Sequence, residues 1–126
     1  MRIALTGVSG FIGSVTARHL AAAGHQVTAL VRSTSRRDHI EDVVDRFVVG
    51  DHADERCWPA LLDGADAVIH NSVDWDFRKS GEEAFDDHLQ SNIVGSLRLL
   101  KASAPRQFVF VSSIAVHHDM RPRWGV

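Results

Sequence analysis

Three glycines spaced three residues apart, Gly7, Gly10 and Gly13, follow the first apolar segment of the chain. That segment, about residues 2–6, reads as a buried strand, and the residues after the glycines read as an amphipathic helix. Gly7 would permit a tight turn, Gly10 a close approach of the backbone to phosphate oxygens, and Gly13 close packing of the helix on the sheet. The free amides of the first helical turn would then face the anion. The segment therefore predicts a site for a nucleotide pyrophosphate.

The whole loop, Thr-Gly-Val-Ser-Gly-Phe-Ile-Gly at positions 6–13, is more informative than its glycines alone. No Gly-Lys-Ser/Thr follows it, which argues against a P-loop kinase or ATPase. The loop closely resembles the coenzyme loop of the extended short-chain dehydrogenase/reductase family, which includes NAD(P)-dependent epimerases and dehydratases, 3β-hydroxysteroid dehydrogenases and dihydroflavonol-reductase-like enzymes. The resemblance covers about residues 2–116. It implies a nicotinamide coenzyme and, for the whole enzyme, hydride transfer at a carbonyl or alcohol carbon of a small-molecule substrate.

The elements that would position this loop alternate between apolar strands and helical segments, a pattern typical of parallel βαβ units. Strands are predicted at residues 2–6, 26–32, 47–50, 67–70 and 108–111. Helices are predicted at residues 10–23, 38–44, 55–62 and 82–102. The expected fold class is α/β, a Rossmann-type doubly wound parallel sheet of about five strands in the order 3-2-1-4-5.

Two of the predicted helices carry recognisable apolar faces. In the first helix Ile12, Val15 and Leu20 are expected to face the sheet, and Gly24 is expected to follow its C-terminus. The last and longest helix has one apolar stripe, formed by Phe85, Leu89, Ile93, Leu97 and Leu100. In the family this helix is half of the usual dimer bundle, and the wholly apolar strand at 108–111 also needs cover. Self-association of the chain is therefore expected.

The resemblance implies a set of coenzyme-binding residues, namely Gly7, Ser9, Gly10, Phe11, Ile12, Gly13, Arg32, Asp51, His70, Asn71, Ser72 and Asn92. In dinucleotide folds an acidic residue about 20 positions beyond the glycines usually binds the ribose hydroxyls. The corresponding residue here is Arg32, followed by Ser33, Arg36 and Arg37, and guanidinium groups suit a 2′-phosphate. NADP is therefore expected in preference to NAD. Alternatively, Arg36 and Arg37 are solvated and only Arg32 lies near the ligand.

Three further positions match the family to different degrees. Gly50-Asp51 matches a family dipeptide that places a carboxylate near the adenine amino group, and Asp51 is also a candidate cap of the next helix. At residues 70–73 the chain has His-Asn-Ser-Val where the family usually has His, an aliphatic residue and two alanines, although Ser72 is small enough to pack beneath the ribose. Asn92 matches the family's Asn-Val-x-Gly. Its main expected role is to bridge helix and strand backbone, with a proton relay as the alternative.

The catalytic residues of the family are only partly present. Ser113, in Ser-Ser-Ile-Ala-Val at 112–116, matches the catalytic serine that hydrogen-bonds the substrate oxygen. The Tyr-x-x-x-Lys pair is absent, because the chain has no tyrosine and both lysines, Lys79 and Lys101, precede Ser113. Residues 1–126 are therefore expected to form one C-terminally truncated coenzyme-binding domain that lacks the catalytic helix and substrate lobe and does not turn over alone. The alternative is a non-catalytic NAD(P)-sensing or regulatory protein.

Composition excludes several other functions. The net charge of −2, with 14 basic and 16 acidic residues, does not indicate the excess of basic residues that nucleic-acid binding requires. No apolar run reaches the length of about 20 residues needed to span a bilayer. The single Cys57 cannot form an intrachain disulfide, so a cytoplasmic location is expected. His117-His118-Asp119 is interpreted as an exposed polar loop, and no metal site is expected.

Overall fold

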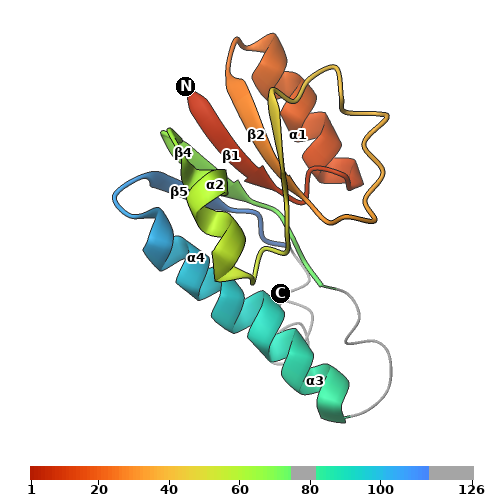
Figure 1. Cartoon of the computed structure of the whole chain (residues 1–126), viewed down its shortest axis with the longest axis vertical. Coiled ribbons are helices and arrows are strands. Elements are labelled where there is room, and N and C mark those ends of the chain that lie inside the picture. The colour runs from red at the N-terminus through yellow and green to blue at the C-terminus, as the bar shows by residue number, and fades with distance from the viewer. Residues whose placement is uncertain (75–81, 114–126) are drawn as a thin grey trace, which may run out of the picture.

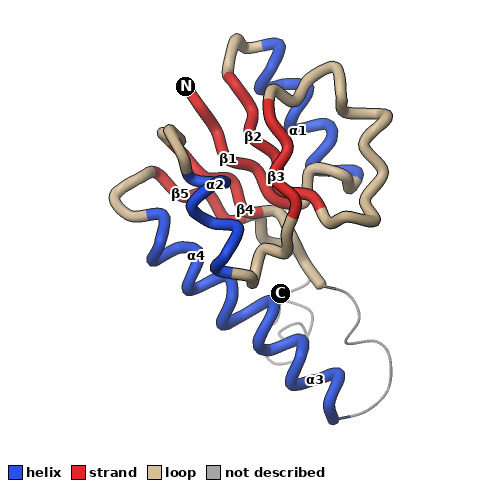
Figure 2. The backbone as a smooth tube through the Cα atoms, in the orientation of Figure 1, coloured by secondary structure: helices blue, strands red, loops and turns tan. Residues whose placement is uncertain are grey.

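The computed structural model describes residues 1–74 and 82–113. Five strands form one sheet in the order β3-β2-β1-β4-β5, and every neighbouring pair is parallel. The strands are β1 Arg2–Thr6, β2 Gln26–Val31, β3 Arg46–Val49, β4 Ala67–His70 and β5 Gln107–Phe110. Figure 2 shows them side by side, with β1 at the centre of the sheet. The predicted fold class and strand order are confirmed.

Helices cover both faces of the sheet (Figure 1). One face carries α1, and the other carries α2 and α4. The helical elements are α1 Phe11–Ala22, the 3₁₀ turn η1 Glu55–Cys57, α2 Trp58–Leu62, α3 Glu82–His88, the π-helical segment η3 Leu89–Gly95, and α4 Ser96–Ser103. Parallel sheets need such cover because both of their faces are apolar. Within residues 1–74 and 82–113, no helix combines the length and hydropathy needed to cross a bilayer.

Two apolar clusters form the core, one on each face of the sheet. Successive side chains of a strand point to opposite faces, so Ala4 of β1 joins one cluster and Leu5 joins the other. The buried members beneath α2 and α4 are Ala4, Leu30, Cys57, Trp58, Leu61, Leu62, Val68 and Leu99. The buried members beneath α1 are Leu5, Val8, Ala17, Val27, Ala29, Val31, Ile40 and Val44.

Helix α1 packs on the sheet through small residues. Its buried residues are Gly13 and Ala17, while Ile12 is 55% exposed and Val15 is 42% exposed. The expectation that Ile12 and Val15 face the sheet is therefore wrong, and of the three predicted residues only Leu20 packs against the core. Small residues four apart let the helix axis approach the strands closely, and this turns the bulkier side chains outward.

The C-terminus of α1 matches its prediction. Gly24 has a φ of +83°, a conformation that glycine adopts without steric cost. Its N–H donates to the Ala21 carbonyl at 2.9 Å, and the His25 N–H donates to the Leu20 carbonyl at 3.0 Å. These two bonds satisfy carbonyls left open at the helix end, as in a Schellman motif.

The helix expected at residues 38–44 is absent, and successive turns occupy this stretch. Ile40 N–H donates to the Arg37 carbonyl at 2.8 Å, and Val43 N–H donates to the Ile40 carbonyl at 3.1 Å. The Glu41 N–H also donates to the Arg37 carbonyl at 3.1 Å, but this single four-residue bond is not continued, so the stretch closes turns without propagating an α-helix. Ile40 and Val44 are buried in the core cluster on the face of the sheet that α1 covers. Tertiary packing has therefore overridden the local helical pattern.

The long helix from α3 to α4 turns its predicted apolar stripe away from the sheet. Leu99 is fully buried against the core, and Gly95 lies so close to Ala53 that an added Cβ would be 2.7 Å from the Ala53 Cβ. The stripe residues, by contrast, are 37% to 60% exposed: Phe85, Leu89, Ile93, Leu97 and Leu100. The helix therefore has one buried face, formed by Gly95, Ser96, Leu99 and Ser103, and a separate exposed apolar face.

Candidate functional site

A cavity of about 710 Å³ opens at the carboxyl ends of the strands. Each strand contributes a residue from just beyond its end, namely Gly7, Arg32, Gly50, Asn71 and Val111. The strand order reverses between β1 and β4, and in open α/β sheets ligands bind at this crossover. The topology alone therefore places a binding site here.

Gly7 and Gly13 are required by the packing of the protein itself. Gly7 has a φ of +70°, and an added Cβ would lie 2.6 Å from the Asn71 carbonyl oxygen. An added Cβ at Gly13 would lie 2.0 Å from the Gly7 carbonyl oxygen and 2.8 Å from the Val8 Cα. Both contacts are with backbone atoms, which cannot rotate away. The glycine loop, the start of α1 and the residues after β4 are therefore packed together without room for a side chain.

Gly10 differs from the other two glycines because nothing in the described structure crowds it. Its φ of −81° and ψ of 173° are available to any residue, and the nearest atom to an added Cβ is 3.5 Å away. Gly10 is the N-cap of α1 but supplies no side-chain cap, and the first turn carries no acidic residue. A side chain here would project into the cavity. The loop thus presents bare backbone and an uncompensated helix N-terminus, which suits a phosphate group.

The cavity gathers most of the predicted binding residues. Those that line it are Gly7, Ser9, Gly10, Phe11, Ile12, Arg32, Asp51, Asn71, Ser72 and Ser113. Gly13, His70 and Asn92 were also predicted to bind the coenzyme but do not line the cavity. Phe11 is 85% exposed and Ile12 is 55% exposed at the mouth, so the outward turn of α1 brings apolar side chains to the cavity.

Several lining residues were not predicted. Phe110 and Val111 at the end of β5, Ser35 after β2, and His52 after β3 also line the cavity. The signal that would have found Phe110 is its place at the carboxyl end of a parallel strand, because such ends meet at one edge of the sheet. His52 carried no comparable signal. It is buried, and its Nε2 donates to the Ser91 carbonyl at 3.0 Å, a contact between segments 39 residues apart.

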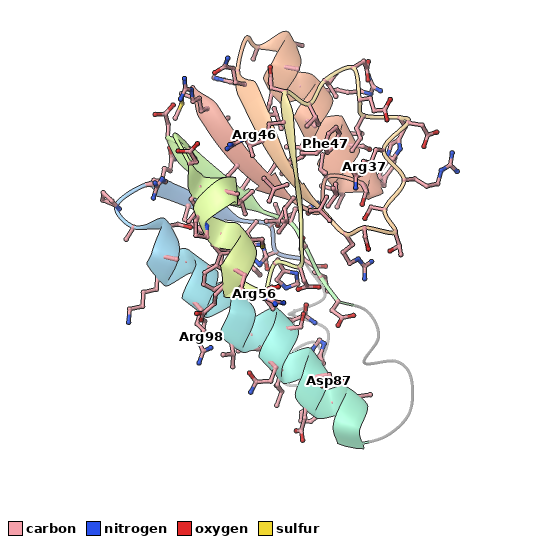
Figure 3. The ribbon with its side chains drawn as sticks, in the orientation of Figure 1. Arg37, Arg46, Phe47, Arg56, Asp87 and Arg98 are labelled. Atoms are coloured by element: carbon pink, nitrogen blue, oxygen red, sulfur yellow. The ribbon has the colours of Figure 1, made fainter. Side chains whose placement is uncertain are left out.

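Arg32 is the arginine that reaches the cavity from the segment after β2. Its N–H donates to Ser35 Oγ at 3.1 Å, and the Ser35 N–H donates to the Arg32 carbonyl at 3.0 Å, so a turn fixes its backbone. Arg36 instead pairs with Asp38 at 2.8 Å, and this hydrogen bond lowers the pKa of the Asp38 carboxyl. Arg37 lies over the ring of Phe47, 5.5 Å from its centroid (Figure 3). Of these three arginines, Arg32 lines the cavity, whereas Arg36 and Arg37 contact partners elsewhere.

Asp51 lines the cavity but does not cap the following helix. Its Oδ1 accepts the Ala53 N–H at 2.9 Å in a local turn. The side chain that caps η1 is Asp54, which accepts the Arg56 N–H at 3.0 Å. The capping expectation for Asp51 is therefore wrong, and its half-exposed carboxylate remains directed to the cavity edge.

His70 lies behind the cavity wall, fully buried. Its Nδ1 is 2.7 Å from Thr6 Oγ1 and its Nε2 is 2.7 Å from Ser96 Oγ. Burial, and secondarily the nearby His52, lower the pKa of His70 to about 4, so the ring is neutral at physiological pH. The geometry gives His70 no direct contact with a ligand in the cavity.

Asn92 bridges the long helix and the segment after β4. Its Oδ1 accepts the Asp74 N–H at 2.7 Å, and its Nδ2 donates to the Asp74 carbonyl at 2.8 Å and to His88 Nδ1 at 2.7 Å. This paired contact with a backbone is the structural role expected for Asn92. It anchors Asp74, which itself lines the cavity.

Ser112 and Ser113 line the end of the cavity that β5 contributes. The rest of their motif, residues 114–116, and His117-His118-Asp119 lie outside the described residues. Within the described part of the chain, no group of three or more His, Cys, Asp or Glu side chains converges as a metal site. Cys57 is buried, and its Sγ donates to the Asp54 carbonyl at 3.0 Å.

The parallel sheet, its crossover and the glycine loop at the start of α1 together define a dinucleotide-binding α/β fold. The family model of the NAD dependent epimerase/dehydratase family matches residues 3–123. The chain belongs to this family.

Individual relatives agree with this membership. The chain is 33% identical over 115 residues to a putative dihydroflavonol 4-reductase of Synechocystis sp., covering 88% of this chain and 32% of the relative. It is 32% identical over 133 residues to a UDP-glucose 4-epimerase of Klebsiella pneumoniae, covering 94% of each. A solved UDP-glucose 4-epimerase from Stenotrophomonas maltophilia, with bound NAD and formylated UDP-arabinopyranose, superimposes with a TM-score of 0.78 at 30% identity. That match covers 93% of this chain and 38% of the epimerase.

Proposed function

We propose that this chain binds a nicotinamide adenine dinucleotide in the cavity at the strand ends, with the diphosphate against the backbone from Ser9 to Gly13. The observation that carries the proposal is Gly10, whose lack of a side chain no intramolecular contact requires. The residues present fit the coenzyme: bare amides for the diphosphate, Arg32 and Asp51 for the adenosine half, and small Ser72 beside the loop. A bound nicotinamide supplies or accepts a hydride.

The direct test is fluorescence titration of the chain with NADH and with NADPH. Saturable binding of either coenzyme with a micromolar dissociation constant is expected. A chain that is folded by circular dichroism and shows no saturable binding of either coenzyme up to millimolar concentration would contradict the proposal.

The activity of the whole protein is proposed from the family and from Ser113. An oxidoreductase or epimerase would act at a carbonyl or alcohol carbon, and Ser113 would donate a hydrogen bond to the substrate oxygen. The second candidate is a non-catalytic NAD(P)-sensing protein, which would keep the coenzyme cavity without the Tyr-x-x-x-Lys pair. The coding sequence after Val126 discriminates between them, because a Tyr-x-x-x-Lys there supports the enzyme and its lack supports the sensor.

The environment of Arg32 favours NADP over NAD. Arg32→Glu is expected to weaken NADPH binding about tenfold to hundredfold, since a charge-assisted hydrogen bond to a phosphate contributes about 1.5–3 kcal/mol. NADH, which lacks the 2′-phosphate, should lose less than about threefold. Arg36→Glu is the matched control, because Arg36 already pairs with Asp38 and should leave both affinities unchanged. Tighter binding of NADH than NADPH by the wild-type chain would reverse the preference.

The exposed stripe of the long helix supports self-association. Leu97 is 60% exposed and Ile93 is 50% exposed, on a face that points away from the sheet. The wild-type chain is expected to be a dimer by light scattering, and Leu97→Glu is expected to be monomeric. Ala102→Glu, an exposed position on the same helix but outside the stripe, is the control and should remain dimeric. A monodisperse wild-type monomer would contradict this expectation.

A cytoplasmic location is also proposed. The single cysteine is buried and unpaired, which suits a reducing compartment. The expected partners are a coenzyme, a small-molecule substrate in the whole enzyme and a second copy of the chain, with no nucleic acid, since the net charge is −2.

A further inference from the structure

A buried chain of hydrogen bonds joins helix α4 to the wall of the cavity. It runs from Ser96 Oγ to His70 Nε2, and from His70 Nδ1 to Thr6 Oγ1, with both distances 2.7 Å. Thr6 Oγ1 also lies 3.0 Å from the Asn71 nitrogen and 3.1 Å from the Ser72 nitrogen. Thr6 and His70 are fully buried, so water does not compete for these bonds.

The direction of each hydrogen bond follows from the donors available. The amides of Asn71 and Ser72 can only donate, so they occupy both lone pairs of the Thr6 hydroxyl. The hydroxyl proton of Thr6 is therefore left for His70 Nδ1, which must accept. The ring proton then lies on Nε2 and is donated to Ser96 Oγ. His70 is thus held as one neutral tautomer.

The surroundings of the ring favour this neutral state. The rings that face His70 are His52 at 5.2 Å, Phe110 at 5.6 Å and Phe108 at 6.1 Å between centroids. Of these three rings, His52 has a carboxylate beside it, because Asp51 Oδ1 lies 3.6 Å from His52 Nδ1. No carboxylate among the described residues contacts the His70 ring, and burial depresses its pKa to about 4.

We propose that His70 is a positioning residue of the coenzyme site, which acts by fixing the Thr6 hydroxyl and, through it, the backbone of Asn71 and Ser72. This inference rests on the proposed coenzyme binding. Asn71 and Ser72 line the cavity, and the Asn71 carbonyl lies in close contact with Gly7 of the loop. Loss of the acceptor at His70 Nδ1 would therefore displace the backbone of Asn71 and Ser72, against which the glycine loop packs.

The tautomer is tested without any coenzyme. In nitrogen-15 NMR spectra of the wild-type chain, His70 is expected to have an unprotonated Nδ1 and a protonated Nε2, unchanged from pH 8 to about pH 5. An Nδ1–H tautomer or an imidazolium at pH 7 would overturn the proposal, whether or not the chain binds coenzyme.

A matched pair of variants separates positioning from general stability. Asparagine places its Oδ1 near the position of Nδ1, so His70→Asn retains the acceptor for Thr6. Glutamine places its amide nitrogen near the position of Nε2, so His70→Gln retains the donor to Ser96 and loses that acceptor. Affinity for NADH or NADPH, whichever binds wild type more tightly, is expected to stay within about threefold in His70→Asn and to fall at least about tenfold in His70→Gln.

Three further variants complete the test, namely Ser96→Ala, Thr6→Val and the double variant of Thr6→Val with His70→Gln. Ser96→Ala removes the far end of the chain of hydrogen bonds and is expected to lower stability while leaving coenzyme affinity within about threefold of wild type. The affinity of the double variant should be no lower than that of the weaker-binding single variant, Thr6→Val or His70→Gln. Both substitutions act through the same hydroxyl group, so their effects should not add. Equal losses in His70→Asn, His70→Gln and Ser96→Ala, or additive losses in the double variant, would overturn the proposal. If the wild-type chain binds coenzyme and the variants show either of these patterns, the proposal for His70 fails while the proposed coenzyme binding stands.

Discussion

Gly10→Val will abolish tight coenzyme binding and leave the fold intact. The expected loss is about a hundredfold or more in affinity, equivalent to about 2.7 kcal/mol. Valine adopts the φ of −81° and ψ of 173° without strain, and no atom lies closer than 3.5 Å to the new Cβ. Its branches project into the cavity where the diphosphate would lie, and they separate the phosphate from the amides of α1.

Titration with NADH and NADPH measures this effect, and urea denaturation measures the fold. The free energy of unfolding should stay within about 1 kcal/mol of wild type, because glycine and valine differ modestly at an N-cap. Ala22→Val, an exposed change at the other end of α1, is the control and should bind coenzyme as wild type does. Undiminished binding by Gly10→Val would remove the observation on which the proposed function rests.

Gly13→Ala is expected to have the opposite effect and to destabilise the chain by about 3 kcal/mol or more. The new Cβ would lie 2.0 Å from the Gly7 carbonyl oxygen, and Gly7 cannot retreat because it already rests against Asn71. The substitution would otherwise favour helix formation by about 1 kcal/mol, so a net loss isolates the steric clash.

Gly10→Ala is the matched control for this measurement. The same methyl group, added three residues earlier in the loop, meets nothing closer than 3.5 Å and should change stability by less than about 1 kcal/mol. Midpoints of urea unfolding, compared at constant slope, give both differences. A Gly13→Ala chain as stable as wild type would show that the helix does not pack against the loop as the structure places it.

The strands were predictable because each one is a short apolar run with a turn signal at its end. β1 and β4 have the predicted bounds, β2 ends one residue earlier than predicted, and β3 and β5 each begin and end one residue earlier. The strand order followed from the family resemblance and from the βαβ alternation. The glycine loop was predictable for a related reason, since three spaced glycines after a strand restrict the backbone to few arrangements.

The faces of helices and the environment of single residues were not predictable in the same way. Val15 is apolar yet exposed, because Gly13 and Ala17 let α1 approach the sheet with its small face. The role of His70 depends on Thr6 and Ser96, which lie 64 and 26 positions away in the sequence. Periodicity reports the period of a local pattern, whereas these contacts depend on how distant segments meet.

Every strand of the sheet supplies one part of the cavity wall, including the two edge strands β3 and β5. A molecule bound there touches the ends of all five strands, from one edge of the sheet to the other. Fraying of either edge would open the wall before the centre of the sheet is disturbed. A ligand that touches all five strand ends is therefore expected to lose its contacts at an edge strand before it loses those with the glycine loop.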